Sequence, residues 1–359
     1  MLEKENRICS YRDWPIQQRI ARVLQDEDFR RHCKHLREMP NFDKNLELIT
    51  KIAQIDISQI QIDKKLLDNQ NKFSKKEISA DTIEFYTMLD ELSPDGVNLV
   101  NRVKQNAQYL ITEGLGRYNG RGYCEAGRGK DGKEYREIYM QVEGRISDTK
   151  TAIHEFAHSC TESFVQNIRI KDFKMKEIPT VITDHLSARF LKGKYPELRE
   201  NFVEDDKFSQ VDNVMKAREC LMEALIVKVM NGEETYENVM KNYGHLYQGH
   251  QDILTRCLER IETIQFEDIM YEERYLVPQM IALEMRERFK KEPELVAKQL
   301  KQILAHEHDW TEEQALDYLG LPQREQLADD YVSKFADRME RLDIEKQRIK
   351  QEKATELKK

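Results

Sequence analysis

Apolar and polar residues follow a helical spacing along most of this chain. Apolar side chains recur at three- and four-residue intervals between Leu46 and Ala53 and again between Phe85 and Leu92, so each segment would present one apolar face to a core. Glycine and proline are sparse, at 14 and 8 of the 359 residues, so few positions interrupt the helices. We expect residues 14–110 to be mostly helical and helices to resume at residue 148.

The segment between residues 114 and 144 has a different pattern. Residues 121–126 are typical of a strand, and residues 127–132 form a glycine-rich turn. Apolar and polar side chains then alternate over residues 135–142, which is the two-residue period of a half-buried strand. The pattern predicts a β-hairpin, and this is the only strong strand signal in the chain.

The composition excludes several classes of protein. Hydrophobic residues make up 39% and charged residues 35% of the chain, as expected for an ordinary core beneath a charged surface. The net charge of −8 disfavours a nucleic-acid partner, because phosphate contacts require clustered lysine and arginine. No stretch approaches 18 consecutive apolar residues, so we expect no membrane span and no membrane partner.

The N-terminal residues and the cysteines indicate a cytoplasmic protein. Residues 1–6 are charged and lack the apolar region of a secretory signal, although export by an unconventional route is left open. The cysteines are scattered without a Cys-x-x-Cys pair, and we expect them to be reduced thiols. They are Cys9, Cys33, Cys124, Cys160, Cys220 and Cys257.

Residues 154–158 carry the clearest chemical signal, with the sequence His-Glu-Phe-Ala-His. On a helix, His154 and His158 lie one turn apart on the same face, so both imidazoles can bind one metal ion. Glu155 would then lie beside the open position of the metal, where a carboxylate can take a proton from a metal-bound water. The pattern predicts a catalytic zinc site with Glu155 as the general base.

The surroundings of this motif favour a buried helix. Ser147, Asp148 and Thr149 are candidates for its N-cap. An apolar stripe at helical spacing would seat the helix in the core. The stripe consists of Ile153, Phe156, Ala157, Cys160 and Phe164.

A catalytic zinc needs a third protein ligand and one open position. Pro179 suits the first turn of a second helix, in which Glu177 and Asp184 lie two turns apart on one face. We interpret Glu177 as the third ligand and Asp184 as a residue that orients a ligand histidine. His185 is the rival ligand, although it lies on a different face from Glu177. The alternative role of Glu177 is to stabilise the first turn of its helix.

These segments together resemble the oligoendopeptidase family of zinc metallopeptidases, which includes thimet oligopeptidase and oligoendopeptidase F. The resemblance covers roughly residues 108–342 and rests on four segments in the family's order. The first segment runs from Gly122 to Thr151, where a strand leads into Asp148-Thr149-Lys150-Thr151, and the second is the helix from Ala152 to Glu162. The third is Glu177-Ile178-Pro179-Thr180 with Asp184, and the fourth is the tyrosine-containing segment from Met270 to Gln279.

The resemblance implies roles for further residues. Tyr275 and then Tyr271 would polarise the scissile carbonyl, as tyrosine hydroxyls of that segment do in the family. A substrate strand would pair with the edge strand at Tyr139, Met140, Gln141 and Val142. It also implies one zinc ion per chain and a peptide or protein as substrate.

This chain departs from the family pattern in three respects. It is much shorter than typical members, which implies a reduced N-terminal helical lobe. Gln265 stands where the family usually has a histidine, and residues 272–274 interrupt the tyrosine run. A cluster between two helices is a candidate for the missing donor, although ordinary packing is the favoured interpretation of its members. They are Tyr243, His245, Tyr247 and His250.

The predicted fold is predominantly α with a small β-hairpin or sheet. A zincin-like catalytic domain at residues 108–345, of the helical oligoendopeptidase type, would follow an N-terminal helical region at residues 1–107. A charged C-terminal tail would occupy residues 346–359.

The predicted function is zinc-dependent endopeptidase activity on oligopeptides. Two alternatives remain: a non-catalytic zinc-binding or regulatory protein on a zincin scaffold, and a protease specific for one folded protein. A zinc protease of another branch is disfavoured by the match at residues 177–180.

Overall fold

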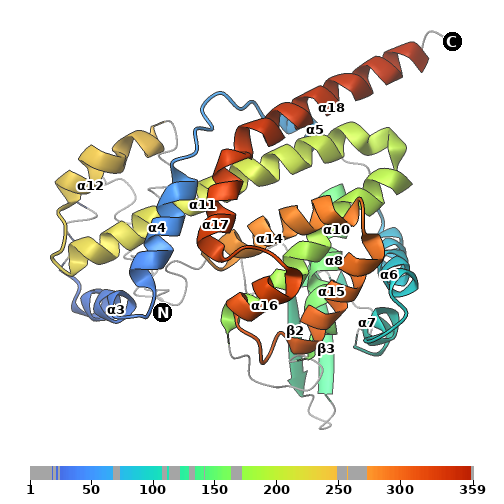
Figure 1. Cartoon of the computed structure of the whole chain (residues 1–359), viewed down its shortest axis with the longest axis horizontal. Helices are drawn as coiled ribbons and strands as arrows, with labels where there is room; N and C mark the ends of the chain where they lie inside the picture. The colour runs from blue at the N-terminus through green and yellow to red at the C-terminus, as the bar shows by residue number, and fades with distance from the viewer. Residues whose placement is uncertain are drawn as a thin grey trace. The chain divides into compact units, whose positions relative to one another are not determined.

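The protein is predominantly helical, with one small sheet (Figure 1). The computed structural model describes residues 18, 22, 25–67, 73–106, 111–112, 122–128, 134–140, 142–162, 172–248, 257 and 273–356. The described residues form two compact units, which lie within residues 1–60 and 209–276 and within residues 61–208 and 277–359. This division follows spatial contacts, whereas the domain boundary that we expect at residues 107 and 108 stays a prediction.

The first unit contains α3, α4, the second part of α11, α12 and the short helix η3. Arg218, which is buried on α11, donates to the carbonyl oxygens of Ala53 and Ile55 at 3.0 Å each and so caps the C-terminal end of α4. The element bounds are Glu27–Arg37 for α3, Phe42–Ala53 for α4, Arg199–Met230 for α11, Tyr236–Tyr243 for α12 and Gly244–Tyr247 for η3.

The second unit contains the sheet and the helices around it. Its helices before the sheet are α5 (Lys64–Leu67), α6 (Lys75–Leu92) and α7 (Leu99–Asn106), and those directly after it are α8 (Ile146–Cys160), η1 (Phe173–Lys176), α10 (Glu177–Lys194) and η2 (Pro196–Leu198). The first part of α11 and most of α14 (Glu273–Phe289) follow. The last helices are α15 (Pro293–His306), α16 (Glu312–Leu319), α17 (Arg324–Ser333) and α18 (Phe335–Glu356).

The sheet confirms the predicted pairing of two antiparallel strands. Strand β2 (Gly122–Arg128) pairs with β3 (Glu134–Met140) along its whole length, from Gly122 opposite Met140 to Arg128 opposite Glu134. Strand β1 (Ile111–Thr112) pairs with β3 in parallel, on the other side.

The sheet order corrects one expectation. The described strands have the order β1-β3-β2, so β3 is the central strand and not the edge. Tyr139 pairs with Tyr123 on one side and with Thr112 on the other, and its backbone is therefore not open to a substrate strand. The sequence pattern could not reveal this, because alternation identifies a strand but not its neighbours.

Helix α8 is the centre of the second unit, and it packs against α6, α7, α10, β2 and β3. Its predicted apolar stripe is buried from Ile153 to Cys160, while Phe164 lies outside the described residues. The helix begins earlier than expected, at Ile146, and the Asp148 carboxylate accepts hydrogen bonds from the backbone N–H groups of Glu143 at 2.7 Å and Arg145 at 3.0 Å. These bonds fix the start of the helix that follows β3.

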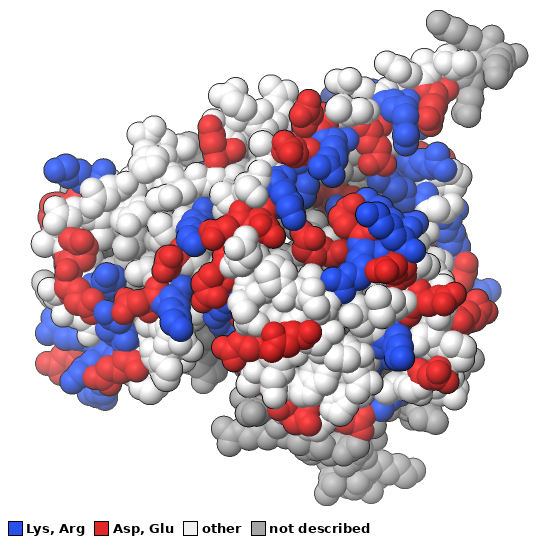
Figure 2. Space-filling model, in the orientation of Figure 1, with Lys and Arg blue, Asp and Glu red and all other residues white. Residues whose placement is uncertain are grey.

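Helix α18 lies along the outside of the second unit and is held by ion pairs. Lys346 meets the buried Glu204 at 2.5 Å, and Asp343 meets Lys207 at 2.6 Å. Figure 2 shows the acidic and basic side chains interspersed beside this helix. The charged C-terminal segment is helical as far as Glu356.

Among the described helices, none has both the length and the apolar character that a membrane crossing requires.

Candidate metal centre

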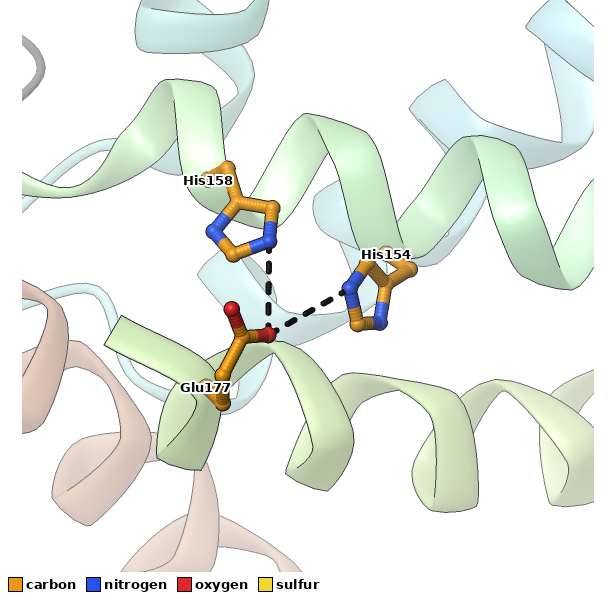
Figure 3. Close-up of side chains that lie close together, drawn as sticks. All are labelled: His154, His158 and Glu177. Carbon is orange, nitrogen blue, oxygen red and sulfur yellow. Dashed lines mark ion pairs between the residues drawn. The ribbon is translucent and has the colours of Figure 1, made fainter. Parts of the chain in front are cut away.

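Helices α8 and α10 pack together and bring three potential metal ligands to one point (Figure 3). His154 and His158 project from successive turns of α8, and Glu177 is the first residue of α10. The Glu177 Oε2 atom lies 3.8 Å from the Nε2 atom of His154 and 3.6 Å from the Nε2 atom of His158. One ligand atom from each residue lies within 4.8 Å of the others.

This arrangement fits a divalent metal ion. Tetrahedral ligand atoms at about 2.1 Å from zinc are about 3.4 Å from one another, which is close to the observed separations. Two imidazoles and one carboxylate form the donor set of a catalytic zinc site, in which the fourth position stays open. The three residues that the sequence predicts as ligands lie close together and can therefore hold a metal ion.

Asp184 occupies the position that the sequence suggests for an orienting residue. Its Oδ2 atom lies 2.9 Å from the Nδ1 atom of His154. A neutral His154 would donate its Nδ1 proton to this carboxylate, which leaves the lone pair of Nε2 directed at Glu177. The Nδ1 atom of His158 is buried without a hydrogen-bond partner among the described residues.

The site in the metal-free protein has strongly perturbed proton affinities. Burial opposes the positive charge on His154, but the Asp184 carboxylate, together with Glu155 and Glu177, raises the pKa of His154 to about 10. Burial also raises the pKa of Glu155 to about 7. Burial, together with the charge on His154, holds the pKa of His158 well below its usual value. Without a metal, the site thus retains a proton on His154.

His185, the rival ligand, belongs to another part of the structure. Its Nε2 atom lies 2.8 Å from the Oε1 atom of Gln279 on α14, and burial lowers its pKa to about 4. His185 is not part of the ligand group, as expected from its place on a different face of α10. The choice of Glu177 over His185 agrees with this geometry.

The predicted tyrosines and substrate strand are only partly described. Tyr275 belongs to the first unit, where the ammonium group of Lys216 lies 5.3 Å from the centre of its ring. Tyr271 and Gln141 lie outside the described residues. Met140 is buried, and Val142 follows β3 with a half-buried side chain. The roles of these residues stay predictions.

Tyr247, a member of the cluster that the sequence offers as an alternative donor, has a packing role. Tyr247 is buried, and its hydroxyl donates to the carbonyl oxygen of Arg218 at 2.8 Å. His245 is exposed, and His250 lies outside the described residues. This agrees with the packing interpretation favoured for the cluster.

Two ion pairs beside α10 could not be predicted from the sequence. Lys150 of α8 meets Asp205 of α11 at 2.5 Å, and Arg286 of α14 meets Asp206 at 3.1 Å. Burial opposes the charge of Lys150, but Asp205 and Asp206, and to a smaller extent Asp184, raise its pKa. These partners are far apart in the chain, so no local spacing identifies them.

Comparisons with known proteins find a similar fold among solved structures but no match by sequence. No protein-family model matches the chain, and no curated protein matches it. Among solved structures, a putative peptidase from Chlamydophila abortus matches 92% of this chain with a TM-score of 0.51 and 16% identity. A putative oligoendopeptidase F from Bacillus anthracis matches 92% with a TM-score of 0.47 and 12% identity.

The chain spans 57% and 60% of the lengths of these two proteins. At 16% identity, the first likeness shows the fold alone. The chain therefore has a helical fold like that of a putative peptidase, and α8 and α10 of this fold carry a candidate metal centre.

We predict that the purified protein binds one metal ion per chain and that His158→Ala abolishes this binding. The variant removes one of three ligands, and two remaining ligands would not retain the ion in a chelating buffer. Elemental analysis after dialysis measures the metal content. His245→Ala, at an exposed histidine of η3, is the matched control and should retain the metal. Equal metal content in the two variants would show that the ions lie elsewhere.

We also predict that metal binding at pH 8 releases a proton from His154. The pKa of His154 is raised to about 10, so the metal-free protein holds this proton at pH 8 and loses it only as the pH rises through that value. Asp184→Asn removes the carboxylate that raises the pKa, and should reduce the release. Calorimetry in two buffers of different ionisation enthalpy counts the protons, with Asp95→Asn at an exposed position as control. Unchanged release in Asp184→Asn would contradict the assignment.

Proposed function

We propose that the protein is a zinc-dependent endopeptidase that hydrolyses oligopeptides. The observation that carries the proposal is the convergence of His154, His158 and Glu177 on one point, with Glu155 on the same helix as the two histidines. The likeness of the fold to a putative peptidase supports the choice of reaction. The proposal extends to zinc because this donor set is typical of catalytic zinc sites.

The proposed chemistry divides between the metal and the protein. A zinc ion held by the three ligands would polarise a water molecule and the substrate carbonyl. Glu155 is the general base that accepts the proton of the attacking water and then donates it to the leaving amine. In the metal-free protein, burial already raises the pKa of Glu155 to about 7, and a general base works best when its pKa lies near the working pH.

Further residues of the proposal contribute orientation and charge stabilisation. Asp184 holds His154 with its Nε2 atom directed at the metal position. Tyr275, and second Tyr271, would donate a hydrogen bond to the oxyanion that develops from the scissile carbonyl. Residues 139–142 remain the proposed neighbourhood of the substrate backbone, without pairing at Tyr139, where β3 already has two neighbours.

Two other functions are distinguished by specific observations. A structural or regulatory zinc site has no need for a carboxylate at position 155, and Glu155 is buried at 7% exposure beside the ligands. A protease for one folded protein would share the same chemistry and differ only in substrate. Hydrolysis of a broad peptide library therefore favours the oligopeptidase, and cleavage of a single protein favours the alternative.

The cytoplasmic location expected from the sequence stays a prediction.

The variant Glu155→Gln tests the reaction directly. It preserves the shape of the side chain and all three metal ligands but cannot accept a proton. Turnover of a quenched fluorescent peptide should fall by about a hundred- to ten-thousandfold, while the metal content stays at that of the wild type. Glu91→Gln, at an exposed position of α6, should leave turnover unchanged. Equal turnover in Glu155→Gln would assign the base to another group.

The variant Tyr275→Phe tests the proposed oxyanion donor. It removes only the hydroxyl and keeps the ring that Lys216 contacts. The turnover number should fall by roughly ten- to a thousandfold, as for the loss of one such donor, while the Michaelis constant changes little. Stopped assays over a range of peptide concentrations separate the two constants, with Tyr318→Phe as control. Full activity would transfer the role to Tyr271.

A further inference from the structure

The backbone of β2 approaches α8 directly at the proposed catalytic base. Gly122 is the first residue of β2 and pairs with Met140 of β3. A Cβ atom at Gly122 would lie 2.7 Å from the Cγ2 atom of Thr151. It would also lie 3.2 Å from the Cγ atom and 3.3 Å from the Oε1 atom of Glu155. Carbon atoms in contact are normally about 3.5–4.0 Å apart, so the site has no room for even one methyl group.

The need for glycine at this position is steric. Gly122 is not among the described residues with positive φ, and it lies in an extended strand, where alanine fits the backbone without strain. Glycine within a strand is unfavourable because it packs no side chain and has the largest backbone entropy to lose. A close approach of backbone to another element offsets this disadvantage, and here that element carries Thr151 and Glu155.

Few of the surrounding groups can move to admit a side chain. Strand β2 is held by its pairing with β3 from Gly122 to Arg128, and α8 is packed against α6 and α10. Thr151 is branched at Cβ and has few rotamers available in a helix. Glu155 follows Thr151 by one helical turn and has the longer, more adaptable side chain. A methyl group at position 122 would therefore push strand and helix apart at the Thr151 methyl, and the Glu155 side chain, which the same Cβ would meet, would be displaced with them.

We infer that Gly122 and Thr151 together set the position of the Glu155 carboxylate, so that Gly122 is a positioning residue of the active site. The role of Glu155 itself rests on the function proposed above. Thr151 precedes Glu155 by one turn of α8, and the backbone of Gly122 approaches both side chains from the side of the sheet. The three atoms nearest to a Cβ at Gly122 belong to Thr151 and Glu155 and not to a candidate metal ligand.

The consequence concerns catalysis more than binding. A general base must lie within about 2.6–3.2 Å of the proton that it accepts, and a misplacement of about 1 Å can lower a rate on the order of a hundredfold. A displaced carboxylate should therefore reduce the turnover number and leave the metal in place. Substrate affinity should change little, because the base acts in the transition state.

A set of four variants tests this inference by removing and restoring the space. Gly122→Ala should lower the turnover number on the order of ten- to a hundredfold, with the Michaelis constant and the metal content unchanged. Thr151→Ser deletes only the Cγ2 methyl and should be nearly silent alone. In the Gly122→Ala background, Thr151→Ser should restore a large part of the turnover, whereas Thr151→Val, which keeps a methyl at Cγ2, should not.

Gly193→Ala is the matched control, because a Cβ atom at Gly193 would meet nothing within 4 Å. It lies in α10, the helix that also carries Glu177, and should keep full turnover. Wild-type turnover in Gly122→Ala would overturn the inference. So would a loss of turnover that Thr151→Ser does not relieve, since this would indicate a general defect in packing.

A second measurement separates this inference from the proposed function. Crystal structures of Gly122→Ala and of Gly122→Ala with Thr151→Ser should show the Glu155 carboxylate displaced in the first and closer to its original place in the second. These structures remain informative if the wild type hydrolyses no peptide, in which case the proposed function fails while the positioning role is still tested. An unmoved Glu155 carboxylate in Gly122→Ala would overturn the positioning role whatever the activity.

Discussion

The packing of α8 against α10 is the contact on which the candidate site depends. The two histidines are neighbours because they lie one turn apart on α8, but Glu177 meets them only because α10 begins beside that face. The hydrogen bond between Asp184 and His154 joins the same two helices, two turns after Glu177 along α10. A shift of one helix along the other would separate the ligands and break this bond together.

The cost of this arrangement is a concentration of buried charge. In the metal-free protein, burial and the neighbouring carboxylates oppose each other at His154, and Asp184 holds the pKa of this histidine near 10. Burial also raises the pKa of Glu155 to about 7, so the three carboxylates and two histidines of the site cannot all adopt their usual charges. A divalent cation would relieve this conflict, since it neutralises the carboxylates and replaces the proton on His154.

Local sequence signals account for much of the fold and for the candidate metal ligands. The helical spacing identified α8 and its buried stripe, and the alternation from residue 135 to 142 identified β3. The spacings within residues 154–158 and between Glu177 and Asp184 were sufficient because all of these residues act on single helical faces. Long-range pairing left no such signal. The parallel contact of β1 with β3, the ion pair of Lys150 with Asp205 and the approach of Gly122 to Glu155 each join segments that are distant in the chain.

The most direct test of the central claim is a crystal structure of the zinc-loaded protein with anomalous data collected on both sides of the zinc absorption edge. We expect one anomalous peak at about 2.0–2.2 Å from the Nε2 atoms of His154 and His158 and from a carboxylate oxygen of Glu177. We also expect Asp184 to keep its contact with the Nδ1 atom of His154. A peak bound by other residues, or no peak at this point in a protein that contains stoichiometric zinc, would contradict it.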